Sequence, residues 1–249
     1  MIDRSNLSSF WKEIEKRLGH KMGLKIPSSS GIILDVDLQG KGFRGAYASE
    51  YVHLDGQRFE DAYLIDIDNI DQERVESLGV HESAHRLYWW NLCMKSYTPF
   101  YPYEFRRGEL EGLLKESGGN ESLAKEDKFY RCLLSETFAF YSQIALLGSH
   151  ELEVIRYLLP NVDTMDSLIA RTKEDKEEFI EWIKSGIIKD INIFNYHANY
   201  AGASVAKKLF QNGRSNQEIR DFFLEERLAE QDSRTDFLYS RFCDLFALL

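Results

Sequence analysis

Apolar residues recur at intervals of three and four in the first segment of the chain, "NLSSFWKEIEKRLGHKMG" at 6–23. The apolar positions of this segment are Phe10, Trp11, Ile14 and Leu18. This spacing places them on one side of an α-helix, and Ser8 or Ser9 could cap its first turn. The "IPSSSG" segment that follows interrupts the period. The pattern therefore predicts an amphipathic helix near the start of the chain.

Short runs rich in β-branched and aromatic residues come next, separated by glycine and aspartate. They are "GIILDVDLQG" (31–40), "FRGAYAS" (43–49), "YVHLDG" (51–56) and "AYLIDIDN" (62–69). Runs of this kind predict three or four β-strands. The Asp-Gly pair at 55–56 is typical of a tight hairpin turn.

After residue 70 the period becomes helical, and Val75, Leu78, His81 or Glu82, His85 and Trp89 fall at spacings of three and four. We expect a helix over about 71–94. Further helices are expected at about 105–117, 126–148, 150–159, 164–171, 174–185, 192–212 and 215–246. The predicted fold class is α+β, with a small N-terminal α/β lobe (1–98) that holds a short mixed sheet and the 71–94 helix. A mainly helical lobe (99–249) follows, and the two lobes form one structural unit.

The segment "GVHESAHRLYWW" (79–90) contains the pattern HExxH in the expected helix. Because a helix advances about 100° per residue, His81 and His85 project from the same side, one turn apart. Two such imidazoles can bind one zinc ion, and Glu82, one step round the helix, can take a proton from a water that the metal activates. The alternative is a pair of ordinary histidines with a structural role.

A third ligand is expected from "LLSETFAFYSQIALLG" (133–148), in which Glu136 stands within an apolar run. Burying an unpaired carboxylate is costly, and a metal ion would neutralise it. The sequence leaves two alternatives open: Glu136 forms an ion pair with an arginine such as Arg86 or Arg131, or it lies on a solvent-facing side of the helix.

HESAH at 81–85 followed by SETFA at 135–139 resembles the gluzincins, zinc peptidases with HExxH and a later ExxA-type glutamate. The resemblance implies a zincin-like fold in which His81, His85 and Glu136 bind one zinc ion and Glu82 is the general base. Many gluzincins carry an aspartate one turn after the ligand glutamate, and this chain has Phe140 there. Another acid would have to orient the histidine, or the site is looser.

A second segment, "NYHANYAGASVAKKLFQNG" (195–213), faintly resembles the helix of thimet-type oligopeptidases that faces the zinc. His197 or Tyr200 could donate a hydrogen bond to the oxyanion that forms when water attacks a peptide carbonyl. Simple aromatic packing is an equal alternative. Gly202 and Ala203 would permit close packing. A peptide substrate could add as a strand to a sheet edge, either 62–69 or one of the earlier strands.

The charge balance restricts the partners. The chain has 31 basic and 41 acidic residues and a formal net charge of −10, which argues against nucleic acid and against an anionic membrane surface. Cys93, Cys132 and Cys243 form no CxxC pair, and no signal core or membrane span is evident. A cytoplasmic location is therefore expected.

The sequence predicts a zinc-dependent metallopeptidase, a hydrolase that acts on peptide or protein substrates. A catalytically inactive zinc-binding or peptide-binding relative is the alternative. A third hypothesis is a helical interaction protein in which HESAH has no metal-binding role. The oligomeric state cannot be predicted from the sequence.

Overall fold

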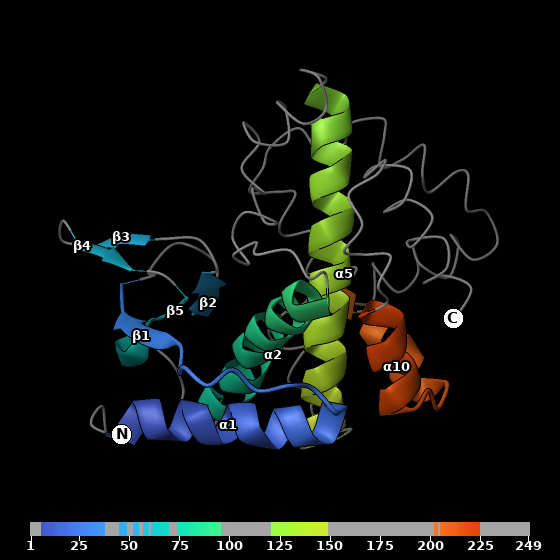
Figure 1. Ribbon diagram of the computed structural model, residues 1–249, viewed down its shortest axis with the longest axis horizontal. Coiled ribbons are helices and arrows are strands. Elements are labelled where there is room, and N and C mark those ends of the chain that lie inside the picture. Colours follow the sequence, from blue (N-terminus) through green and yellow to red (C-terminus); the bar gives the residue numbers. More distant parts are fainter. Residues whose placement is uncertain are drawn as a thin grey trace.

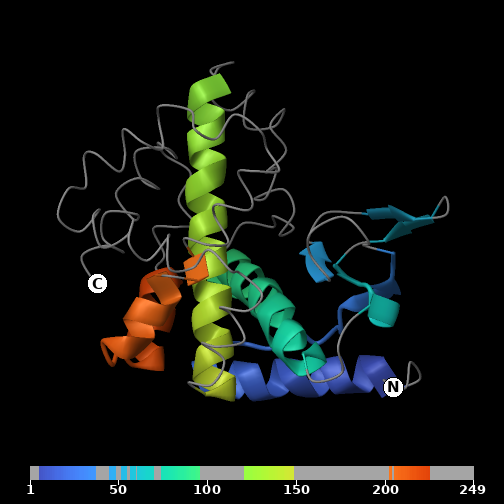
Figure 2. The ribbon, with the colours of Figure 1, turned by 180° about the vertical axis from the view of Figure 1, so that it is seen from behind.

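The computed structural model of the chain describes residues 6–37, 45–48, 52–54, 57–59, 61–69, 74–95, 121–148, 202–203 and 205–224. In this part the fold is α+β and mostly helical, as predicted (Figure 1). The strands lie at one end of the molecule, and helix α2 lies between them and helix α5 (Figures 1 and 2). The helices expected at about 105–117, 150–159, 164–171 and 174–185 fall outside the described residues.

Helix α1 (Leu7–Met22) confirms the first amphipathic segment. Its N-cap is Asn6, so the cap predicted at Ser8 or Ser9 is wrong, because both serines lie inside the helix. The helix ends at Gly23, whose φ of 65° is the left-handed conformation that glycine adopts without strain. Trp11, Ile14 and Leu18 are buried.

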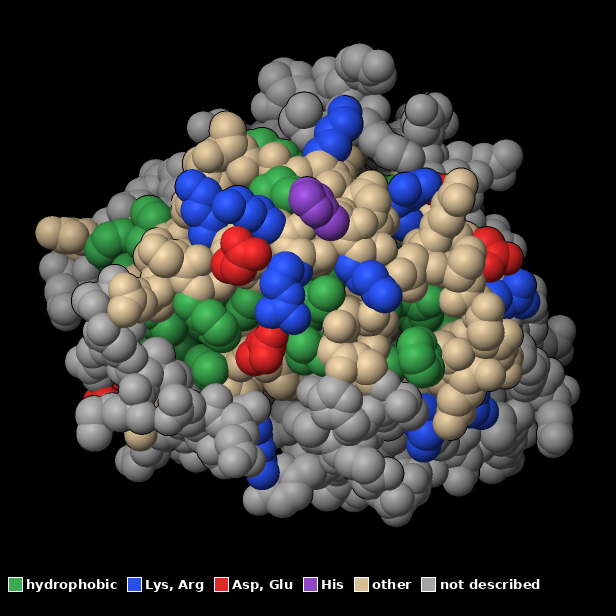
Figure 3. Space-filling view, turned by 90° about the horizontal axis from the view of Figure 1, so that it is seen from below, with side chains coloured by type: hydrophobic (Ala, Val, Ile, Leu, Met, Phe, Trp, Pro, Cys, Tyr) green, Lys and Arg blue, Asp and Glu red, His purple; other side chains and the backbone are tan. Residues whose placement is uncertain are grey.

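The opposite side of α1 faces solvent and is charged. Its exposed basic residues are Lys12, Lys16, Arg17 and Lys21. Lysine and arginine side chains, with acidic ones between them, are spread over the face of the molecule on the side of α1 (Figure 3). The apolar positions of the sequence pattern therefore lie on the buried side of α1, and the basic positions lie on the exposed side.

The main sheet has three strands in the order β1-β5-β2. Strand β1 (Ile32–Asp35) runs parallel to β5 (Ala62–Ile65), and β2 (Gly45–Ala48) runs antiparallel to it. Because β5 is central, 62–69 is excluded as the free edge, and the other alternative, one of the earlier strands, remains. Among the described residues the edges of this sheet are β1 and β2. Three of the four residues of β5 are buried, in agreement with its short continuous apolar run.

Strands β3 (Val52–Leu54) and β4 (Gln57–Phe59) form a separate antiparallel pair in which Leu54 lies opposite Gln57. This register confirms the hairpin predicted at Asp-Gly 55–56. Strand β4 was not among the predicted strands, since three residues with two polar side chains carry no strand pattern. A short 3₁₀ turn, η2 (Ile67–Asn69), follows β5.

Helix α2 (Val75–Lys95) confirms the helix expected at about 71–94, and α5 (Glu121–Leu147) begins earlier than the expected 126. Helix α2 packs against α1, β2 and α5. A Cβ atom at Gly79 would lie 2.7 Å from Ile14 Cδ1, so the lack of a side chain there lets α1 and α2 approach closely. Within the described residues, no helix is both long enough and apolar enough to cross a membrane.

Helix α10 (Asn216–Phe223) begins with a capping box between Ser215 and Glu218, and residues 205–211 before it are also helical. A single hydrophobic core includes side chains of α1, α2, α5 and the 203–224 segment. The predicted division between 98 and 99 lies outside the described residues.

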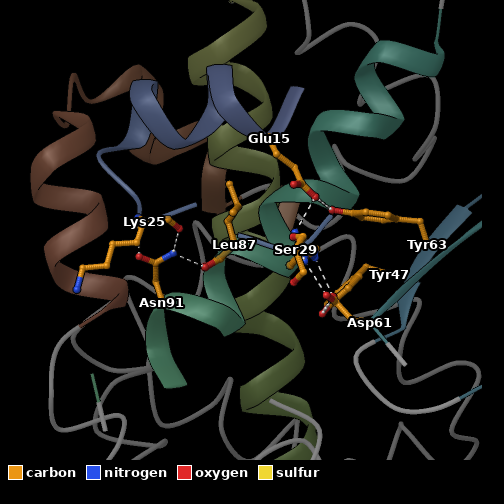
Figure 4. Close-up of polar contacts among 9 residues, drawn as sticks. Glu15, Lys25, Ser29, Tyr47, Asp61, Tyr63, Leu87 and Asn91 are labelled. Atoms are coloured by element: carbon orange, nitrogen blue, oxygen red, sulfur yellow. Dashed lines mark hydrogen bonds and ion pairs between the residues drawn. The ribbon is translucent and has the colours of Figure 1, made fainter. Parts of the chain in front are cut away.

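A buried guanidinium joins α1 and α2 to the residue that precedes β5, and Figure 4 labels its partners Glu15, Ser29 and Asp61. Arg86 of α2 is 1 % exposed. Its Nε and Nη2 atoms donate to the two carboxylate oxygens of Asp61 at 2.8 and 2.6 Å, and Nη1 donates to Glu15 Oε1 at 3.0 Å. The Ser29 carbonyl accepts a further bond from Nη2, and Tyr63 Oη donates to Glu15.

Burial and the charged partners act in opposite directions on the pKa values of this cluster. It raises the pKa of Glu15, and the Arg86 charge and the Tyr63 hydrogen bond offset only part of that effect. For Arg86, burial lowers the pKa, but the bonds to Asp61 and the neighbouring acidic groups raise it more, so the guanidinium stays charged. A permanent positive charge is thus held in the interior by its partners.

Replacing Arg86 by methionine should lower the free energy of unfolding by about 3–5 kcal/mol, because the buried carboxylate of Glu15 and the partly exposed one of Asp61 would lose their cation. Arg17→Met is the matched control. Arg17 pairs with Glu76 at 2.6 Å on the surface, so its loss should cost less than about 1 kcal/mol. Urea unfolding of the three proteins measures both values, and equal costs for the two variants would contradict the buried-charge interpretation.

Candidate metal centre

His81, His85 and Glu136 meet where α2 crosses α5. The two Nε2 atoms lie 3.1 Å apart. His81 Nε2 lies 3.3 Å from Glu136 Oε2, and His85 Nε2 lies 3.5 Å from Glu136 Oε1. One ligand atom from each residue lies within 4.8 Å of the others. The sequence named these three residues, and the structure brings them together.

The spacing of the three donors suits a small divalent cation. Zinc binds imidazole nitrogen and carboxylate oxygen at about 2.0–2.1 Å, so two ligands of a tetrahedral ion lie about 3.3–3.4 Å apart. The two Nε2 atoms lie 3.1 Å apart, near this value, and each lies close to a different oxygen of Glu136, at 3.3 and 3.5 Å. A catalytic zinc held by three protein ligands keeps its fourth position for a water or a substrate atom.

Both imidazoles are oriented through their other nitrogen. His81 Nδ1 lies 3.3 Å from Gln143 Oε1, and His85 Nδ1 lies 2.8 Å from Ser135 Oγ. The Gln143 amide nitrogen donates to Ser77 Oγ at 2.6 Å, which leaves its oxygen to face His81. Since an amide oxygen can only accept, His81 donates from Nδ1 and directs the lone pair of Nε2 at the cluster.

The partners of the two imidazoles differ from those expected. The sequence required an acid to take the place of the missing aspartate, but among the described residues an amide and a hydroxyl do so. Phe140, at the position of that aspartate, covers the His81 ring, with centroids 4.4 Å apart. The Ser135 hydroxyl is itself held in place, because Trp89 Nε1 also donates to Ser135 Oγ.

Glu136 is a mostly buried carboxylate, 17 % exposed at its side chain. Its Oε2 atom is buried and finds no hydrogen-bond donor among the described residues. An ion pair with Arg86 is ruled out, because that guanidinium binds Asp61 and Glu15. The side chain of Arg131 lies outside the described residues. A buried carboxylate oxygen that lies beside two imidazole nitrogens is well suited to a cation.

The pKa values of His81 and Glu136 also indicate that positive charge is favoured in this cluster. Burial lowers the pKa of His81, but its contact with Glu136 and the charges of Glu82 and Glu136 raise it more. Burial raises the pKa of Glu136, but His85 and His81 lower it more, so it stays well below its usual range. A proton on His81 is therefore favoured beside the Glu136 carboxylate when no metal is bound.

Glu82 points to another side of α2. It is 5 % exposed, and its Oε2 accepts a hydrogen bond of 2.6 Å from the backbone N–H of Tyr47 in edge strand β2. The carboxylate thus faces the edge of the sheet, and its negative charge is close enough to His81 to raise the pKa of that imidazole.

The 202–211 segment reaches the third ligand. A Cβ atom at Gly202 would lie 2.6 Å from Glu136 Cβ and 2.9 Å from the backbone nitrogen of Thr137. The close packing predicted at Gly202 and Ala203 is confirmed, and both residues are buried. His197 and Tyr200 lie outside the described residues.

Sequence reasoning missed the residues that support the ligands. Ser135 and Gln143 are polar residues in the apolar run that holds Glu136, and both are buried. Their position in an apolar run was the signal by which the sequence could have identified them. Tyr47 had no such signal, because its part in the site is a backbone N–H. Comparisons of the chain with protein-family models, curated proteins and solved structures gave no match.

The pH dependence of stability should reveal the proton that the cluster holds without metal. The pKa of His81 is raised in the folded state. The protonated imidazole therefore stabilises the fold fully below about pH 6.5, and this stabilisation is lost as the pH rises through the pKa of the folded state. The cost of His81→Gln, measured by urea unfolding in EDTA, should therefore be larger at pH 6 than at pH 8.5. His20→Gln, at an exposed position of α1, is the control and should cost little at either pH.

Zinc should take the place of that proton. At pH 8.5 a zinc concentration 100 times the Kd should stabilise the wild type by about 2.7 kcal/mol, and His81→Gln should abolish most of this gain. A wild-type protein whose stability does not respond to zinc would contradict the metal site.

Proposed function

We propose that this chain is a zinc-dependent metallopeptidase of gluzincin type with a zincin-like fold. One observation carries the proposal. Two buried or nearly buried imidazole nitrogens lie 3.1 Å apart, each within 3.5 Å of an oxygen of the Glu136 carboxylate, and a buried carboxylate, Glu82, follows the first ligand directly on the same helix. That combination is what hydrolysis by an activated water requires.

Each residue has a separate role in this proposal. His81, His85 and Glu136 hold one zinc ion, which supplies Lewis-acid activation of a water and of the scissile carbonyl. Glu82 is the general base that takes a proton from the attacking water and passes it to the leaving amine. Because Tyr47 N–H binds Oε2 of Glu82, Oε1 is the oxygen with which Glu82 exchanges the proton.

The arrangement of elements supports the fold proposal. The HExxH helix α2 packs against the small mixed sheet through β2 and against α5, which supplies the third ligand. Edge strand β2 reaches Glu82, so an extended peptide beside this edge would have its carbonyl close to the base. The proposed substrate is accordingly a peptide or protein segment in extended form.

His197 and Tyr200 remain the proposed donors to the oxyanion. They precede Gly202 by five and two residues in the sequence, and Gly202 packs directly against Glu136. A donor carried on this segment would act on the oxygen that becomes negative as water attacks the carbonyl.

Zinc content and turnover together test the function. Protein purified without added metal should hold about one equivalent of zinc and cleave members of a peptide library. Glu82→Gln should lower kcat by at least about 10²-fold and retain its zinc, since it removes the base and none of the ligands. Glu76→Gln, at a partly exposed position of the same helix, is the control and should keep wild-type kcat.

Two outcomes would contradict the peptidase. Wild-type protein that holds zinc but cleaves no peptide would favour the inactive zinc-binding relative. Folded protein with less than about half an equivalent of zinc would favour an interaction protein in which the histidine pair has only a structural role.

Removing an oxyanion donor should slow turnover without loss of metal. His197→Gln or Tyr200→Phe, whichever residue donates, should lower kcat about 10²–10³-fold at unchanged zinc content. Tyr141→Phe is the control, because its hydroxyl binds the Arg214 carbonyl and has no part in the proposed chemistry. If both variants at 197 and 200 keep the wild-type kcat, neither residue is the donor.

A further inference from the structure

Two pairs of residues lie side by side on α2, each with the i, i+4 spacing of a helix. His81 and His85 face Glu136 of α5. Glu82 and Arg86, one residue later, face the sheet. Each residue advances about 100° around the helix, so the second pair lies on a different side of α2 from the first. One side therefore carries the proposed metal ligands, and the other binds the sheet.

The sheet-binding pair holds Tyr47 of β2 at two points. The backbone N–H of Tyr47 donates to Glu82 Oε2 at 2.6 Å. Its hydroxyl donates to Asp61 Oδ1 at 2.8 Å, and Asp61 in turn accepts two bonds from Arg86. Figure 4 shows the Tyr47 side chain directed at Asp61. The main chain and the side chain of one residue are therefore both tied to α2.

We propose that Tyr47, held by Asp61 and Arg86, is the positioning residue for the carboxylate of Glu82. This inference rests on the proposed function, in which Glu82 is the general base. A glutamate side chain has several rotatable bonds, and a short hydrogen bond from a fixed N–H to one oxygen sets where the other oxygen points.

Strand β2 needs such an anchor because, among the described strands, it is an edge of its sheet. An edge strand is paired on one side only, so fewer backbone hydrogen bonds hold it in place. The Tyr47 hydroxyl, through Asp61, fixes this part of β2 relative to α2. Without that bond the N–H could move relative to Glu82, and the carboxylate would lose its fixed orientation.

The backbone of Asp61 supports the same interpretation. Its φ of 55° makes it the one non-glycine residue with positive φ among the described residues. Such a conformation persists where the surroundings hold the residue firmly, and here a bidentate guanidinium and a tyrosine hydroxyl do so. The strained residue lies in the connection between Tyr47 and Arg86, where a rigid link is needed.

A purely structural role for the hydroxyl would predict a different result, and Tyr63 provides the comparison. Its ring centroid lies 5.5 Å from that of Tyr47, on the adjacent strand. Its hydroxyl donates to Glu15 and not to Asp61. Tyr63→Phe thus removes the same chemical group from the same sheet and leaves the contact between Tyr47 and Glu82 in place.

The test uses Tyr47→Phe in the full chain, with Tyr63→Phe as the matched control. Tyr47→Phe should lower kcat about tenfold at unchanged KM and zinc content, because ligands and substrate contacts remain while the base is less well oriented. The amide proton of residue 47 should also exchange with solvent at least about tenfold faster than in the wild type. Tyr63→Phe should change neither the kcat nor this exchange rate.

Amide exchange keeps the two proposals distinguishable. If the wild type cleaves no peptide, the proposed function fails, but the exchange rate at residue 47 still tests the positioning role. Faster exchange in Tyr47→Phe, and in Asp61→Asn should the first variant fold poorly, supports it. Wild-type exchange in the variant overturns the inference, and so does an equal fall of kcat in Tyr47→Phe and Tyr63→Phe.

Discussion

The rest of the structure depends on the buried charge of Arg86. A guanidinium in the interior is stable only when its counter-charges are in place, and these come from Glu15 of α1 and from Asp61 at the start of β5. The requirement fixes the sheet, α1 and α2 in one relative arrangement. Helix α2 is then left with one further side to bury, and α5 covers it with Glu136 directed at the two histidines.

The separation of charges on α2 keeps Glu136 available to a cation. Arg86 follows His85 directly on α2, yet its guanidinium is fully occupied on the sheet side. Within the described part of the chain, the ion pairs of Glu136 are therefore with the two imidazoles. A divalent ion with one carboxylate ligand would carry a formal charge of +1, and the Glu82 carboxylate beside it would balance that charge. Ser135 and Gln143 orient the histidines without adding charge.

The local part of the candidate site could be predicted because helix geometry alone determines it. Residues four apart lie on the same side of any helix, so the pairing of His81 with His85 needed no knowledge of the fold. Glu136 could be named because an acid within an apolar run is costly unless something neutralises it. The hairpin at 55–56 and the amphipathic α1 were predictable for the same reason, since each is set by a few neighbouring residues.

Contacts between distant segments were decided only by the tertiary structure. The central place of β5, the amide and hydroxyl that hold the histidines, and the link from Tyr47 to Glu82 each join residues that are far apart in the chain. No short-range pattern encodes which of several strands is flanked on both sides, or which polar group meets an imidazole. Sequence thus determined the chemical groups and their spacing along each helix, and packing determined which groups met, because only packing brings a backbone N–H of one element to a carboxylate of another.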